Sequence, residues 1–225
     1  MDNEIYIQTI KKECAFLEKE GYFFNQSENN IYYTKEEETE GFRIRFSWLE
    51  YGDSFITHGL TAEKRFNIIE QEIQKVLGDE LTSYFTMCKN PLIDYIPAGL
   101  KFSSEENQNR FVSNTVNDIE FFGEYVYAFY NNTVLDFFKN YKNIHFVNDQ
   151  LKELLDQKKI QTVLTSMGNT TILRFYVIAF VSQNKPIMDF FNETYFPYLK
   201  ENLSNELNRV ELNRFEKLLI NLQRI

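Results

Sequence analysis

Cysteine, proline and glycine are scarce in this chain, whose 225 residues include 2, 4 and 8 of them, respectively. The two cysteines, Cys14 and Cys88, form no CxxC spacing, so the sequence does not indicate a disulfide framework. So few prolines and glycines disfavour a turn-dense β-sandwich and favour helices. The longest apolar stretch, residues 172–181, contains Arg174 and is too short to cross a bilayer.

The residues that most often carry out catalysis or hold a metal are also few. His58 and His145 are the two histidines, and no neighbour in the sequence supplies the partner that a catalytic histidine needs. Together with the two scattered cysteines they show no metal-ligand spacing, and the chain has no glycine-rich phosphate loop. The sequence therefore predicts no cofactor and no metal, and it favours a protein that is not an enzyme.

Acidic residues outnumber basic ones, 33 to 24, which gives a net charge of −9. Phosphate backbones and anionic lipids repel such a chain, so we expect a basic protein as partner, and neither nucleic acid nor a membrane. Solubility alone is the simpler interpretation of the charge. The first residues, MDNEIYIQTIKKE, lack the apolar core of a secretion signal, which predicts a cytoplasmic protein.

Residues 1–78 alternate between helix and strand patterns. Apolar residues recur at helical spacing over residues 7–17, and they alternate with polar residues over 42–48, the clearest strand. The other extended segments are residues 22–24, 31–34 and 55–60. Thr61 is a candidate cap for a second helix, which Gly78 ends. The pattern predicts an α+β unit, with a helix, an antiparallel meander of three or four strands, and a second helix.

After residue 78 the pattern becomes helical. Residues 79–103, which contain two prolines, are interpreted as a linker or irregular segment. Ser103 and Glu106 match a capping box, so residues 104–225 are predicted to form an all-α helical domain. Its helices are expected near residues 104–121, 123–140, 148–157, 171–183, 187–202 and 204–223.

The order of segments in the first 78 residues is similar to that of a known group of domains. The succession FLEKEGYFF, IYYTK, FRIRFSWL and SFITHGL, closed by an amphipathic helix, resembles small bacterial α+β domains of unknown function. Members of that group occur beside polymorphic toxins and are suspected immunity proteins. The resemblance implies a protein that binds another protein, and it assigns no site residues.

A run of charged residues, KEEETE at positions 35–40, is interpreted as the tip of a hairpin. Solvation accounts for most such runs, but loops on a rigid scaffold also carry binding residues, and this one would dock on a basic surface. The candidate binding residues are Glu36, Glu37, Glu38 and Glu40.

Three further residues are candidates for a pocket or a reactive group. They are Cys88, His58 and Trp48, and Cys88 is included because the neighbouring Lys89 favours a reactive thiolate. The aromatic residues over 121–130 either line an apolar ligand pocket or, as is more common, fill a core.

Two functions therefore compete. The first is a cytoplasmic, non-catalytic protein-interaction module, an immunity-like binder of a basic partner. The alternative is a small-molecule-binding protein or enzyme, with a pocket between the sheet and the helical region. A structural or oligomeric scaffold without a ligand is a third interpretation.

Overall fold

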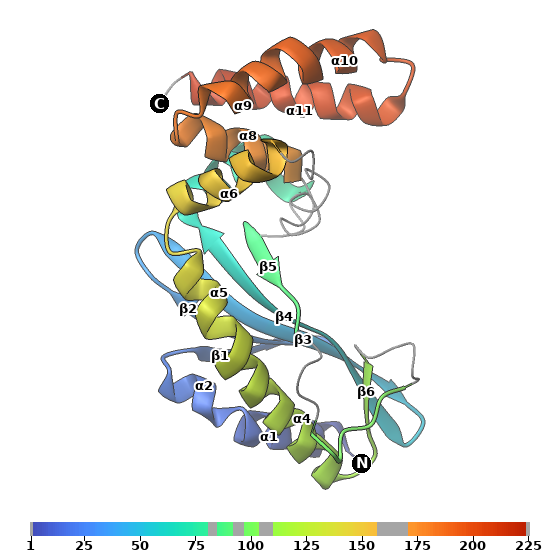
Figure 1. Cartoon of the computed structure of the whole chain (residues 1–225). Coiled ribbons are helices and arrows are strands. Elements are labelled where there is room, and N and C mark those ends of the chain that lie inside the picture. The colour runs from blue at the N-terminus through green and yellow to red at the C-terminus, as the bar shows by residue number, and fades with distance from the viewer. Residues whose placement is uncertain (1, 81–84, 92–96, 104–109, 157–170, 224–225) are drawn as a thin grey trace. The chain divides into compact units, whose positions relative to one another are not determined.

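The computed structural model of this chain describes residues 2–80, 85–91, 97–103, 110–156 and 171–223 (Figure 1). Backbone contacts divide the chain into two compact units. Unit 1 comprises residues 1–64 and 89–140, and unit 2 comprises residues 65–88 and 141–225. The fold is α+β, as the sequence predicts, with a helix and an antiparallel meander followed by a helical region.

One six-stranded sheet is built mainly from unit 1. Its strands are β1 (Phe23–Ser27), β2 (Asn30–Glu36), β3 (Glu40–Tyr51), β4 (Ser54–Phe66), β5 (Met87–Lys89) and β6 (Arg110–Ser113). The first five lie in chain order, and β6 pairs antiparallel with the first part of β4. The predicted alternation in β3 is confirmed, because Phe46 and Trp48 are buried while Arg45 and Ser47 are partly exposed.

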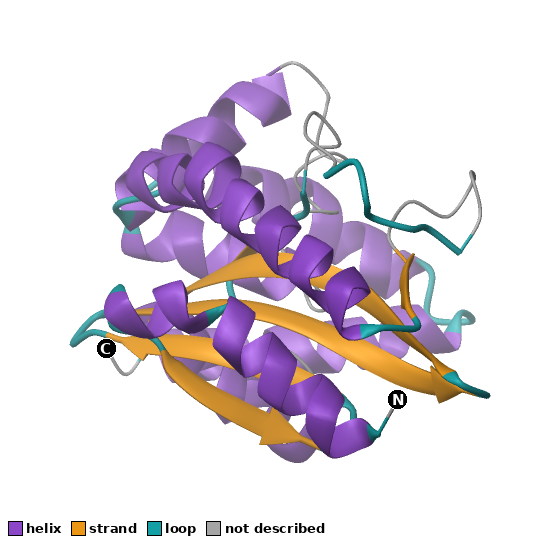
Figure 2. Cartoon of the chain, turned by 90° about the horizontal axis from the view of Figure 1, so that it is seen from below, coloured by secondary structure: helices purple, strands orange, loops and turns teal. Residues whose placement is uncertain are grey.

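Helices cover one face of the sheet in unit 1 (Figure 2). These helices are α1 (Asn3–Glu13), α2 (Ala15–Lys19), α4 (Val116–Phe129) and α5 (Leu135–Asn140), with a π-helical turn (Tyr130–Val134) between the last two. The ring of Phe46 lies 5.1 Å from that of Phe122 on α4, and Phe55 stacks 4.5 Å from Tyr6 on α1. Aromatic residues of β3 and β4 thus join both helices to the sheet in one core.

A glycine shifts the register of side chains along β4. Phe55 and Thr57 contact Tyr6 and therefore face α1. Strict alternation would place Glu63 on the same face, but its carboxylate contacts arginines of β3 on the opposite face. Gly59 lies between them with a φ of +69°, the left-handed conformation that the first residue of a G1 β-bulge adopts.

Unit 2 is mostly helical. Its helices are α3 (Asn67–Leu77), α6 (Ile144–Asp156), α8 (Thr171–Val181), α9 (Lys185–Phe190), α10 (Phe196–Glu201) and α11 (Glu206–Leu222), with a 3₁₀ turn (Gly78–Glu80) and a second π-helical turn (Phe191–Tyr195). Helix α3 packs against α8 and α11. The rings of Tyr176, Phe191 and Phe215 form the centre of this core, within 6.0 Å of one another.

The compact units differ from the predicted division at residues 78 and 104. Helix α3 follows the meander in sequence but packs with the C-terminal helices, and α4 packs against α1. The order of elements along the chain predicted that α3 would pack with the meander, because elements that are neighbours in sequence usually pack together. An amphipathic pattern identifies the buried face of a helix, but it does not identify what covers that face.

Two predicted helix starts were wrong. Thr61 lies inside β4, and α3 begins only at Asn67. Within the predicted helix at 104–121, residues Arg110–Ser113 form β6 instead, and α4 begins at Val116 after a capping box formed by Thr115 and Asp118. The capping pattern proposed at Ser103 falls partly on residues 104–109, which lie outside the described residues. The helices near 148–157, 171–183 and 204–223 were predicted to within a few residues where they are described.

Candidate functional site

A groove in unit 1 lies where α1 and α2 meet α4. It has a volume of about 680 Å³. The lining residues are Glu13, Phe16, Gly123, Glu124, Tyr127, Ala128, Asn131 and Asn132. They come from both ends of the unit's sequence, and they combine carboxylates, amides and two aromatic rings.

Two helices that line this groove approach each other closely at Gly123. A Cβ atom on Gly123 would lie 2.5 Å from Cβ of Glu13, closer than two such atoms can come. Glycine at this position therefore lets α4 approach the last turn of α1. The close approach places Glu13 and Glu124 at the same groove.

Two aromatic rings, those of Phe16 and Tyr127, line the groove. Phe16 meets the ring of Tyr127 edge-on at 5.0 Å and lies 5.7 Å from the ring of Tyr130. Tyr130 is buried, but Tyr127 is 55% exposed, which is high for a large aromatic residue. An exposed tyrosine ring beside carboxylates is a surface on which a lysine or arginine side chain can lay its apolar stem and its charge.

A π-helical turn borders the groove. The backbone N–H of Leu135 donates to the carbonyl of Tyr130, five residues earlier. Asn131 uses its side-chain Nδ2 to donate to the carbonyl of Tyr127 at 2.9 Å. Asn131 and Asn132 are exposed and offer further amide groups to the groove. Single π turns inside α-helices occur frequently at functional sites.

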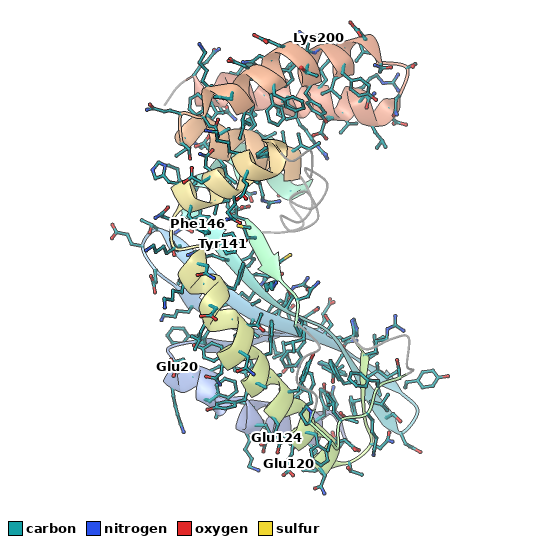
Figure 3. All side chains as sticks on the ribbon, viewed as in Figure 1. Glu20, Glu120, Glu124, Tyr141, Phe146 and Lys200 are labelled. Atoms are coloured by element: carbon teal, nitrogen blue, oxygen red, sulfur yellow. The ribbon has the colours of Figure 1, made fainter. Side chains whose placement is uncertain are left out.

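The charge at the rim is negative. Glu120 and Glu124, labelled in Figure 3, lie four residues apart on α4 and therefore share a face with each other. Lys12 forms an ion pair with Glu13 at 3.0 Å. The hydrogen bond from Lys12 to Glu13 and the charge of Glu13 raise the pKa of this lysine, and Glu120 adds to the effect. Lys12 thus lies near two carboxylates, those of Glu13 and Glu120.

Two tyrosines lie between Phe16 of the groove and the predicted acidic loop. Tyr130 contacts Phe16, and Tyr22 contacts Tyr130 edge-on with ring centroids 6.2 Å apart. Burial raises the pKa of Tyr22, as do Tyr130 and the nearby carboxylates Glu20 and Glu37. Glu20 and Glu37 are therefore both close enough to Tyr22 to act on its hydroxyl group.

The four predicted loop carboxylates have different environments. Glu36 ends β2 and is exposed, and Glu37 and Glu38 lie in the exposed turn that follows. Glu40 begins β3, and its carboxylate lies 2.7 Å from Nζ of Lys64, whose side chain is 1% exposed. Glu40 neutralises this buried lysine and is therefore part of the sheet, whereas Glu37 and Glu38 face solvent.

The other three candidate residues are not brought together. Trp48 lies in the core of unit 1 with its ring 5.6 Å from those of Tyr6 and Phe55. His58 is on the opposite face of the sheet, where it is partly exposed. Cys88 is in β5 within unit 2 and is half-buried.

The described residues include no cluster of three or more histidine, cysteine, aspartate or glutamate side chains able to hold a metal ion. Within the same parts of the chain, no helix is long and apolar enough to cross a membrane. No protein-family description, characterised protein or solved structure matches this chain. The groove therefore has to be interpreted from its own geometry.

The sequence predicted one part of this groove, its aromatic side chain on α4. The aromatic segment at 121–130 was a candidate pocket, but most of its side chains fill the core, and only Tyr127 is both largely exposed and part of the groove. Glu13 and Glu124 were missed because nothing in the sequence connects carboxylates that are more than a hundred positions apart.

Proposed function

We propose that this chain is a non-catalytic protein-interaction module that binds a basic segment of a partner protein in the groove between α1, α2 and α4. The observation that carries the proposal is the exposed ring of Tyr127 beside the carboxylates of Glu13 and Glu124. The net charge of −9 supports it, because a protein of this charge attracts basic partners over a distance.

The residues suggest how such a segment would be bound. A lysine or arginine stem lies over Tyr127, an interaction that contributes about 0.5–2 kcal/mol depending on how dry the site becomes. The charged end reaches Glu124 or Glu13, and the amides of Asn131 and Asn132 bind the backbone of the segment. The exposed carboxylates Glu20 and Glu37 and the half-buried Glu120 increase the rate of association more than the final affinity.

The N-terminal succession of elements favours one form of this function. It resembles domains suspected to be immunity proteins, so the partner would be a basic protein, such as a toxin, that the chain inhibits in the cytoplasm by covering a basic surface.

A selection experiment tests the proposal. A library of random peptides displayed on phage is selected on the folded protein at low ionic strength. We expect enrichment of peptides in which lysine or arginine adjoins an aromatic or aliphatic residue, and an affinity for those peptides that falls as salt is added.

Two variants of equal charge localise the binding. Glu120→Gln/Glu124→Gln removes two carboxylates from α4, and Glu206→Gln/Glu216→Gln removes two exposed ones from α11 in unit 2. The first variant is expected to weaken the selected peptides by about tenfold or more, as lost charge-assisted contacts do, and the second by much less. Equal losses in both, or selection of neutral and acidic peptides, would contradict the proposal.

A further inference from the structure

The face of the unit 1 sheet that the helices leave uncovered carries a group of basic side chains. Arg45 on β3, His58 on β4 and Arg110 on β6 point to this face. His58 and Arg110 are directly opposite each other in the antiparallel pairing of β4 with β6. At this level β4 lies between β3 and β6, so His58 is placed between the two arginines.

A carboxylate that contacts this group, that of Glu63, already pairs with two arginines. Glu63 is 4% exposed, and its two oxygens accept from different arginines. Oε2 lies 2.6 Å from Nη2 of Arg43, and Oε1 lies 2.6 Å from Nε of Arg45. Arg45 keeps 40% of its side chain exposed. Arg110 is exposed and forms no ion pair with the described part of the chain.

Both charges that act on the pKa of His58 are positive. Burial lowers the pKa of His58, and the charges of Arg110 and Arg45 lower it further. A collection of like charges is costly unless an anion lies among them. In a chain with a net charge of −9, this concentration of positive charge on neighbouring strands is unexpected.

We propose that Arg45, His58 and Arg110 form a binding site for a small oxyanion, the phosphate or carboxylate group of a ligand. Neighbouring strands are about 4.8 Å apart, so these long side chains can converge on one group from three strands. Each arginine offers planar N–H donors that match the oxygens of phosphate or carboxylate. The imidazole of His58 adds a further donor, and its protonation is favoured once an anion is bound. Ile56 and Val112, also paired across β4 and β6, give the site an apolar border.

Nuclear magnetic resonance of the two histidines tests this site on the full chain. The pKa of each imidazole is measured with sodium chloride, with inorganic phosphate and with acetate, all at the same ionic strength. Bound anion stabilises the imidazolium, so we expect phosphate or acetate to raise the pKa of His58. His145, which lies on α6 in unit 2, is the control within the same spectrum.

The two anions distinguish the sources of the ligand group. A rise with phosphate alone assigns a phosphoryl group, and a comparable rise with acetate assigns a carboxylate as well. No rise with either anion, or equal changes at His58 and His145, would overturn the proposal.

A substitution distinguishes specific binding of the anion from a general effect of ions on the pKa of His58. Arg110→Gln removes an exposed side chain with no ion-pair partner among the described residues, so the fold should be retained, and unchanged spectra of the core residues verify it. We expect two results: a higher pKa of His58 without added anion, because one repelling charge is lost, and an affinity for the anion lowered by about tenfold. Arg209→Gln on α11 is the matched control and should change neither. An unchanged anion response in Arg110→Gln would count against the site.

Discussion

Arg174 and Glu70 form a buried ion pair across 104 positions of sequence. Nη2 of Arg174 donates to Oε2 of Glu70 at 2.6 Å, and Nε donates to Oε1 at 2.9 Å. Thr86 donates to the same Oε1 at 2.7 Å and accepts from the backbone N–H of Phe66 at 3.1 Å. This network joins α8 to the first turns of α3 inside unit 2, where Arg174 is fully buried.

We expect Arg174→Met to destabilise unit 2 by about 3–5 kcal/mol, because it leaves the carboxylate of Glu70 buried without its counter-charge. Arg174→Met/Glu70→Leu should be more stable than the single variant, since the second change removes the uncompensated charge. Urea unfolding of four proteins checks both statements: the original protein, the single variants Arg174→Met and Glu70→Leu, and the double variant. If the double variant loses the sum of the two single losses, the pair is not coupled.

Gly59→Ala should lower the free energy of unfolding by about 1–2 kcal/mol, the cost of a left-handed conformation for a residue with a Cβ atom. No atom lies within 4 Å of the position that this Cβ would occupy, so the loss comes from the backbone and not from a clash. Gly59→Asn is the matched control and should cost less, because asparagine tolerates positive φ. Thermal unfolding measures the difference. An alanine variant as stable as the original protein would show that β4 has no bulge here.

Asp118 should make unit 1 sensitive to acid. Burial acts to raise the pKa of this carboxyl group, but hydrogen bonds from Lys101, Thr115 and Asn114 outweigh it and lower the pKa from 3.8 to about 2. Because the pKa is lower in the folded state, the ionised group stabilises the fold above the unfolded value, and this stabilisation is lost as the pH falls from about 4 to 2.

Asp118→Asn is expected to cost about 1–2 kcal/mol at neutral pH, the usual effect of losing a helix cap, and to make stability less dependent on pH in that acidic range. Unfolding by urea at a series of pH values checks the prediction. Glu216→Gln, an exposed change on α11, serves as the control. A variant whose stability falls as steeply with acid as the original would assign the effect to other carboxyl groups.

The two cysteines should differ in reactivity. Cys14 is fully buried, and burial raises the pKa of its thiol to about 12. Cys88 is partly exposed in β5. We expect a thiol reagent to modify Cys88 quickly in the folded protein, since the thiolate is the reacting species and Cys14 is buried. In denaturant, we expect the reagent to modify both cysteines. Cys88→Ser should abolish the fast phase. A fast phase that survives this change would mean that Cys14 is accessible.

Local patterns predicted which segments are helices and which are strands. The alternation at Phe42 to Trp48 predicted β3 because a strand with one buried face requires a period of two. The helix that begins at Asn67 was placed too early, at Thr61, since a polar residue with a good capping side chain can equally continue a strand beside a neighbour. Gly59 showed no signal of its bulge, because a glycine in a strand is also compatible with a simple turn.

The sequence alone determined an acidic α+β protein with an aromatic core, because charge, composition and periodicity act within a few residues. The tertiary structure decided which charges remain available. Among the predicted acidic residues it places Glu40 against buried Lys64, and it brings Glu13 to Glu124 through the close contact at Gly123. It also gathers Arg45, His58 and Arg110 on one face. A groove or a charged site depends on distances between remote parts of the chain, and packing sets those distances.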